Sequence, residues 1–148
     1  MKTSSPVLFD KLSSQTFRKR GASFFQETLS RDIENLLNDA SHSAYFDLRN
    51  YEYVDNSVLN LGSSVFNESI PINTNPIVLA EKITEILSKF EPRLDSNSIR
   101  VTPIIDKTDN QVLSILFDIQ GISNINGDRI EINLRIALDY SCGVVSIF

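Results

Sequence analysis

The chain has 148 residues, of which 41% are hydrophobic and 22% are charged, and its formal net charge is −5. This composition is typical of a globular protein, and the length suits one domain whose core needs no disulfides. Acidic residues outnumber basic ones in both halves of the chain, and the only basic run is Arg18-Lys19-Arg20. Because sequence-independent nucleic-acid binding needs clustered basic side chains, we expect no nucleic-acid partner.

The expected compartment is the cytoplasm. Cys142 is the only cysteine, which excludes a disulfide framework within the chain and suits a reducing environment. The residues after Met1 lack the apolar core of a secretory signal. No apolar run approaches the roughly 20 residues that a membrane-spanning helix needs, so we expect no direct insertion into a membrane.

Residues 1–23 are predicted to form an N-terminal arm, and residues 24–148 are predicted to form a single domain. The arm contains a short apolar cluster, followed by basic residues that end at Gly21. The members of the cluster are Val7, Leu8, Phe9 and Leu12. Such a segment can dock on a partner or on its own domain, and a frayed terminus is the simpler alternative.

Apolar residues at helical spacing predict two helices. The first covers residues 24–38, with Ser23 as its N-cap. The second begins after Asn75, an N-cap residue followed by Pro76 at the first helical position. Its apolar stripe consists of Leu79, Ile83, Ile86, Leu87 and Phe90. Pro92 ends it, because the residue before a proline is pushed out of the α region.

The segment between these helices is polar and aromatic. Residues 39–56 predict a loop with one turn of helix at most. Gly62 follows a short apolar stretch, and we expect it to adopt a positive φ angle that ends a short element.

Period-two alternation after the second helix predicts β-strands. Pro103 cannot donate to a strand ladder, so its strand is expected at an edge of the sheet. Asp109-Asn110 predicts a turn, and Asn126-Gly127 predicts a hairpin turn within a wider loop that begins at Gly121. The predicted strands cover residues 99–105, 113–119, 130–138 and 144–148. The expected fold is therefore α+β, with N-terminal helices followed by a three- to four-stranded antiparallel β-meander.

Few residues offer catalytic or metal-binding chemistry. His42 is the only histidine, and neither it nor Cys142 has neighbours at the spacing of a catalytic triad or a zinc site. The chain also lacks a glycine-rich phosphate loop, so we expect no cofactor and no metal. One enzymatic hypothesis remains: Glu91 and Asp95 flank Pro92 and could act as the carboxylate pair of a glycoside hydrolase.

Glu91-Pro92-Arg93-Leu94 is the most informative motif, because it joins the second predicted helix directly to the first predicted strand. Within the chain, Glu91 and Arg93 can form an ion pair across the helix stop. Alternatively, the planar guanidinium of Arg93 can bind carboxylate or carbonyl groups of a partner.

In this setting the motif resembles the glutamate-proline-arginine-leucine signature of the small baseplate wedge family of contractile phage tails. Three other segments resemble the same family. Residues 57–62 are similar to its Leu-Asn-Tyr-Gly segment, with Leu61 in place of the aromatic residue. Residues 31–38 are similar to the helix that precedes this segment in the TssE branch, and residues 7–12 are similar to the N-terminal segment, with Lys11 where arginine is common. The long N-terminus favours the TssE branch, which serves the type VI secretion system.

The resemblance implies a structural subunit rather than an enzyme. Such a subunit joins TssF-like and TssG-like wedge subunits to the first ring of contractile sheath subunits. It works in the cytoplasm, in a baseplate docked at the inner membrane complex. The resemblance also implies partner binding at Glu91, Pro92, Arg93 and Leu94, and an exposed strand edge could accept a sheath strand. A phage tail or a phage-derived injection device is the main alternative, and a hydrolase is the less favoured one.

Overall fold

The computed structural model describes residues 22–63, 74–104, 114–125 and 127–148. The predicted arm lies almost wholly outside these residues, and so does the predicted turn at Asp109-Asn110. Within the described ranges, no helix is long and apolar enough to cross a membrane.

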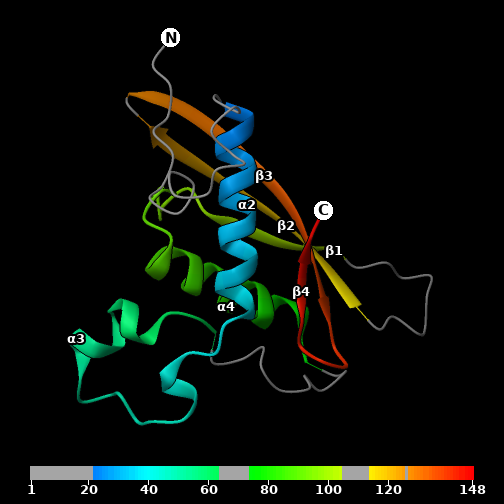
Figure 1. Cartoon of the computed structure of the whole chain (residues 1–148). Coiled ribbons are helices and arrows are strands. Elements are labelled where there is room, and N and C mark those ends of the chain that lie inside the picture. Colours follow the sequence, from blue (N-terminus) through cyan, green and yellow to red (C-terminus); the bar gives the residue numbers. More distant parts are fainter. Residues whose placement is uncertain (1–21, 64–73, 105–113, 126) are drawn as a thin grey trace, which may run out of the picture.

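Both predicted helices are confirmed (Figure 1). Helix α2 spans Ala22–Asn38 and begins two residues before the predicted start. Helix α4 spans Pro76–Phe90, and its N-terminus forms as predicted: the Asn75 side chain accepts a 3.0 Å hydrogen bond from the backbone N–H of Ile77. This bond satisfies one of the donors that a helix start leaves without an internal partner.

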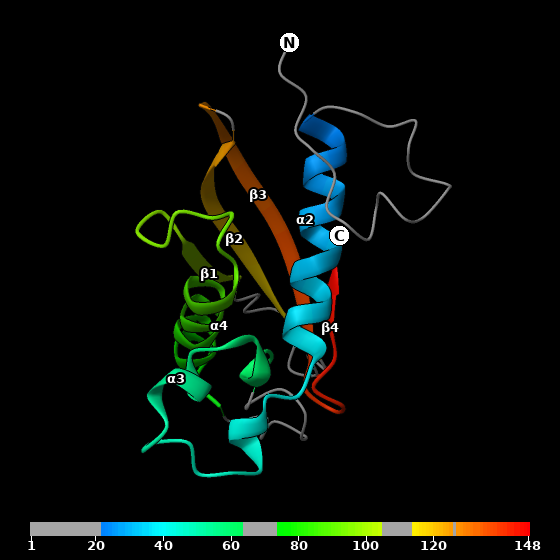
Figure 2. The ribbon, with the colours of Figure 1, turned by 60° about the vertical axis from the view of Figure 1, so that its left-hand side comes forward.

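The segment between these helices holds more structure than the predicted loop. It contains the 3-10 helices η1 (His42–Ala44) and η2 (Val58–Asn60) and the single α-helical turn α3 (Glu52–Asp55). A parallel bridge between Ala40 and Ser63 closes the segment at its base. We call residues 40–63 the lobe; Figures 1 and 2 show it beside α4 and away from the strands.

Gly62 has a φ angle of 120° at the base of the lobe, as predicted. A Cβ atom at this position would lie 2.6 Å from the carbonyl oxygen of Asp39. Glycine is therefore needed here both for the backbone conformation and for the close approach of the two backbone segments.

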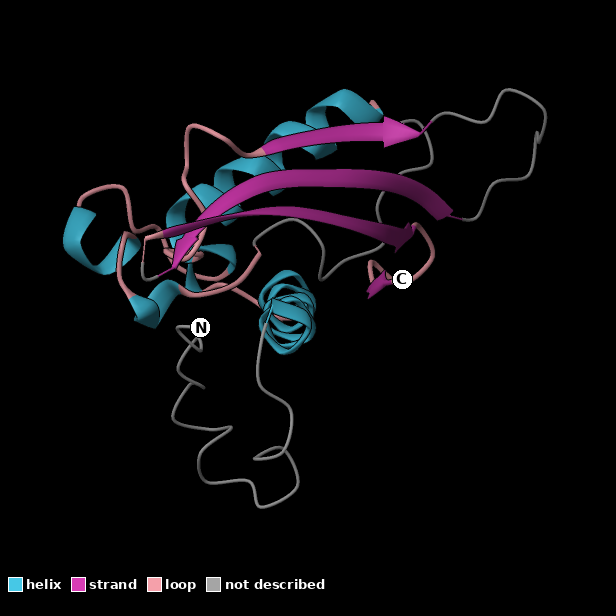
Figure 3. Cartoon of the chain, turned by 90° about the horizontal axis from the view of Figure 1, so that it is seen from above, coloured by secondary structure: helices cyan, strands magenta, loops and turns pink. Residues whose placement is uncertain are grey.

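Four strands form one antiparallel sheet in the order β1-β2-β3-β4. Their bounds are β1 Arg100–Ile104, β2 Ser114–Ile125, β3 Asp128–Asp139 and β4 Val145–Ile147. The predicted α+β meander is thus confirmed, and β1 with Pro103 lies at an edge as expected. Figure 3 looks along α2 and shows this helix beside one side of the sheet.

The predicted wide loop from Gly121 is wrong, because β2 continues to Ile125 and pairs with Asp128 at the start of β3. Strand β2 ends at Ile125 and β3 begins at Asp128, and Gly127 between them has a φ angle of 90°. Polar residues after Gly121 hid this extension. They are tolerated because each of them has a register partner in β3, and because the hydroxyl of the buried Ser123 finds a hydrogen-bond acceptor in the carbonyl of Arg93.

The core lies between one face of the sheet and the two long helices. Residues at alternate positions of β2 and β3 supply the sheet face, as period-two patterning requires. The buried side chains include Leu29, Ile33 and Leu37 of α2; Leu79, Ile83 and Leu87 of α4; and Phe117, Ile119, Ile132, Ile136 and Leu138 of the sheet. The opposite face is polar and carries an ion pair between Asp118 and Arg135.

Side chains of α2 cover the outer edge of β4. The Asn38 amide group accepts from the backbone N–H of Val145 and donates to its carbonyl oxygen, both at 2.8 Å. The Glu34 carboxylate accepts from the N–H of Ile147 at 3.3 Å. These bonds replace the missing neighbouring strand, so the last strand is held by a helix on one side and by β3 on the other.

We expect Asn38→Ala to lower the free energy of unfolding by about 1–2 kcal/mol, because two buried-edge backbone groups of Val145 lose their partner. Asn35→Ala is the matched control: this exposed asparagine lies on the same helix, and the change should shift stability by less than about 0.5 kcal/mol. Urea unfolding followed by circular dichroism measures both. Equal stability of the two variants would contradict the role of Asn38.

Candidate functional site

The motif Glu91-Pro92-Arg93-Leu94 forms a tight corner between α4 and β1. Helix α4 ends at Phe90, and the backbone N–H of Glu91 still donates to the carbonyl of Leu87 at 3.0 Å. The N–H of Leu94 then donates to the carbonyl of Glu91 at 3.2 Å, which closes the turn. Pro92 stops the helix, as predicted, and is itself exposed. We call residues 91–94 the motif corner.

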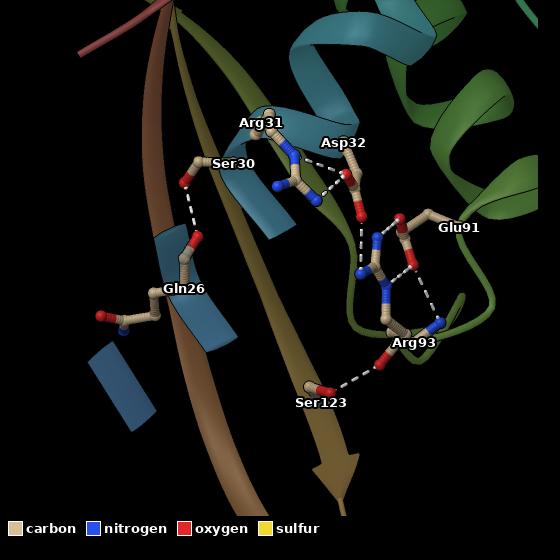
Figure 4. A network of polar contacts seen from close by, with 7 residues as sticks. All are labelled: Gln26, Ser30, Arg31, Asp32, Glu91, Arg93 and Ser123. Carbon is tan, nitrogen blue, oxygen red and sulfur yellow. Dashed lines mark hydrogen bonds and ion pairs between the residues drawn. The ribbon is translucent and has the colours of Figure 1, made fainter. Parts of the chain in front are cut away.

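A bidentate ion pair locks the motif corner (Figure 4). The Nε and Nη2 atoms of Arg93 each donate to a different oxygen of the Glu91 carboxylate at 2.6 Å. The backbone N–H of Arg93 adds a third bond to the same carboxylate at 3.1 Å. Glu91 is only 4% exposed, so its charge depends on these donors. The hydrogen bonds that Arg93 donates to Glu91 raise the pKa of Arg93 above its ordinary value, although burial acts against this shift.

Asp32 connects the motif corner to α2. The Nη1 atom of Arg93 donates to Asp32 Oδ2 at 3.0 Å, and Arg31 holds the other oxygen of Asp32 at 3.0–3.1 Å. The single guanidinium of Arg93 therefore bridges the carboxylate of Glu91, just after α4, and that of Asp32 in α2, which lies 61 positions from Arg93 in the sequence. Its planar fork makes this geometry possible, because lysine offers one point charge only.

The other side of the motif corner is fixed to the sheet. Leu94 is 5% exposed, belongs to the core, and packs against Gly121, where a Cβ atom would lie 3.5 Å from its side chain. The hydroxyl of the buried Ser123 donates to the carbonyl of Arg93 at 2.7 Å. The backbone N–H of Asp95 donates to the carbonyl of Ile122 at 2.8 Å. The motif corner is thus held from both layers of the fold.

A groove of about 680 Å³ opens between α2 and the motif corner. Its wall combines apolar side chains with a polar rim, and Leu61 brings the base of the lobe to its edge. The lining residues are Arg31, Asp32, Asn35, Leu36, Asp39, Leu61, Phe90, Glu91, Pro92 and Arg93. The ion pair therefore lies in the groove wall, where Arg93 keeps a side-chain exposure of 24%.

The structure turns the two charged residues of the motif toward one another, which is the first of the two predicted readings. Glu91 and Leu94 face inward, and Pro92 and part of Arg93 reach the groove. Sequence reasoning missed Asp32 and Ser123 as partners of Arg93. A signal for Asp32 exists, because it follows Arg31 in a segment similar to the family and carries a charge next to the apolar stripe of α2. The sequence offers no such signal for Ser123, because this residue falls in the stretch predicted to be a loop.

Glu91 and Asp95, the carboxylate pair of the hydrolase hypothesis, each form other hydrogen bonds. Both Glu91 oxygens already accept N–H groups of Arg93. The Asp95 side chain instead accepts from the backbone N–H of Asn97 at 3.0 Å, as in a turn. Cys142 is exposed in the turn before β4, and His42 contributes to η1. Across the ranges that the structure describes, no three His, Cys, Asp or Glu residues are grouped so that they could hold a metal ion.

The sequence profile of the family described as baseplate wedge protein gp25 matches residues 25–127. The chain belongs to this family. The match covers most of the chain, from α2 through the lobe, α4 and the motif corner to the end of β2. Searches of curated proteins and of solved structures give no match. Membership in the gp25 family gives the chain a structural role in the baseplate of a contractile tail, in contact with other baseplate components.

We expect Glu91→Ala to lower the free energy of unfolding by about 2–3 kcal/mol. The substitution leaves Arg93 without its main partner in a mostly buried place, and the remaining exposure of Arg93 keeps the loss below that of a fully buried pair. Glu131→Ala, at an exposed position of β3, should change stability by less than about 0.5 kcal/mol. Chemical denaturation measures both, and a stability of Glu91→Ala equal to that of the control would contradict a structural ion pair.

Proposed function

We propose that this chain is the small wedge subunit of a type VI secretion baseplate. In this role it joins TssF-like and TssG-like wedge subunits to the first ring of the contractile sheath, on the cytoplasmic side of an inner membrane complex. The observation that supports this most is the groove at the motif corner. The family signature can serve an interface without being fully exposed. Its ion pair forms part of the groove wall and so shapes the surface that a partner would meet.

The groove suits a segment of a larger wedge subunit. Leu36, Leu61 and Phe90 offer apolar contact, and Asn35 and Asp39 offer polar groups at the rim. Protein interfaces commonly combine such an apolar centre with a polar rim. Because Glu91 and Asp32 hold Arg93 in place before binding, a partner does not have to order this wall, and less conformational entropy is lost on association.

The sheath contact is proposed at the outer edge of β1. An exposed edge can accept an added strand through main-chain hydrogen bonds. The other edge strand, β4, already has Val145 and Ile147 bonded to side chains of α2. In the part of the chain that the structure describes, no hydrogen bond reaches the outer edge of β1 from another element. Of the two edge strands of the sheet, β1 is therefore the better acceptor.

A wedge protein of a phage tail, or of a phage-derived injection device, would use the same fold and the same groove. The neighbouring genes separate these functions: membrane-complex genes of a secretion system support the proposal, and genes of tail fibres and capsids contradict it.

The groove is tested by Asn35→Arg, which places a large charged side chain in it without touching the core. We expect recovery of co-expressed TssF-like and TssG-like subunits to fall at least tenfold, as for an interface hot spot. Gln26→Arg is the matched control, because this exposed residue lies on the same helix outside the groove. Unchanged recovery with Asn35→Arg, at equal thermal stability, would remove the groove from the interface.

The proposed sheath edge is tested by cysteine cross-linking in a Cys142→Ser background, which removes the exposed native thiol. Thr102→Cys lies on β1 and Ser146→Cys on β4, and both positions are exposed. We expect a disulfide with cysteine-bearing sheath strands from the β1 position and none from the β4 position. The reverse pattern would show that α2 releases β4 for pairing.

A further inference from the structure

The lobe presents an apolar surface that the groove does not account for. Tyr53 is 94% exposed, and several other large apolar side chains of the lobe lie on its outside. These are Tyr45, Tyr51, Val54, Val58, Leu59 and Leu61. Scattered single apolar residues on a surface are ordinary, but a group of this size within one short segment marks an interaction site.

Hydrogen bonds and an ion pair hold the backbone beneath this surface. Helix α3 buries none of its residues, so packing against the core does not explain why it forms. Asn60 is buried instead and acts as the centre of the lobe: its amide oxygen accepts from the N–H of Ser43 at 2.8 Å, and its amide nitrogen donates to the carbonyl of Asp55 at 3.0 Å. Lys89 of α4 then holds the Asp55 carboxylate at 2.7 Å. Polar contacts thus hold the inside of the lobe together, and the large apolar side chains named above lie on its outside.

The free charge around this surface is negative. Three cations in and beside the lobe are paired with acids: Arg49 with Asp47, Lys89 with Asp55, and Lys82 with Glu85. Glu52 in α3 is exposed and has no ion-pair partner among the described residues, and the exposed Asp39 adjoins the base of the lobe. A partner that matches this pattern carries Lys or Arg beside aliphatic side chains, since guanidinium and ammonium groups also bind tyrosine rings.

We propose that the outer surface of the lobe binds a basic, aliphatic-rich helix of one of the larger wedge subunits, as a second contact beside the groove. The proposal rests on the function proposed above. Leu61 belongs to both the lobe surface and the groove wall, so one partner subunit can cover both without a gap. A second copy of this chain is a poor occupant, because its net charge of −5 matches the acidic surface in sign.

The experiment uses the full chain co-expressed with both larger wedge subunits. The double variant Tyr51→Ser and Tyr53→Ser, and the single variant Glu52→Lys, should each weaken the complex at least tenfold. Both variants should keep the thermal stability of the wild type, because the side chains of Tyr51, Glu52 and Tyr53 are exposed. Phe148→Ser is the matched control, since this phenylalanine is 79% exposed outside the lobe and should leave binding unchanged. A photo-reactive phenylalanine at position 53 should cross-link to a basic helix of a wedge subunit.

Each other outcome is decisive. Wild-type binding by both lobe variants, with loss of the complex in Asn35→Arg, would overturn the lobe contact and leave the proposed function standing. A cross-link between two copies of this chain, or to an acidic segment, would also overturn it. If the wild-type chain binds neither wedge subunit, the proposed function fails and this contact fails with it.

Discussion

The arrangement of the fold depends on the ion pairs that the guanidinium of Arg93 forms. Arg93 binds Glu91 at the end of α4 and Asp32 in the middle of α2, while its own backbone carbonyl accepts from Ser123 of β2. Three elements distant in sequence thus meet at one residue. Ion pairs in partly buried places are weak sources of net stability, because desolvation offsets much of the attraction. Their better attested use is to select one arrangement among several, and here that arrangement fixes the angle between two helices and the width of the groove between them.

This view changes what the family signature means in this chain. A glutamate, a proline, an arginine and a leucine could each be kept for contact with a partner. In the structure, Glu91 and Leu94 are buried, and only Pro92 and part of Arg93 reach the groove. The rest of the groove wall is formed largely by residues outside the signature, such as Asn35, Leu36 and Leu61. The signature shapes a surface that other residues complete.

Sequence patterning predicted those parts of the fold that local physics decides. Asn75 and Pro76 fixed the start of α4, Pro92 fixed its end, and alternation along β3 fixed a half-buried strand. It did not reach features that depend on distant partners. The extension of β2 beyond Gly121 needs the ladder of β3, and the pairing of Arg93 with Asp32 needs two helices brought together by the core. At the site, the motif itself was found from the sequence, but the inward direction of its charges was not, because either direction satisfies a guanidinium.

The covered edge of β4 limits where a further strand can be added to the sheet. If the sheath binds by strand addition, as proposed above, a sheet with two free edges could accept a strand on either side or pair with another sheet like itself. With Asn38 and Glu34 occupying one edge, the sheet offers a template on the β1 side only. In the proposed baseplate, a subunit built in this way would accept a sheath strand on one side only. Two side chains on α2 would thereby give the assembly its polarity.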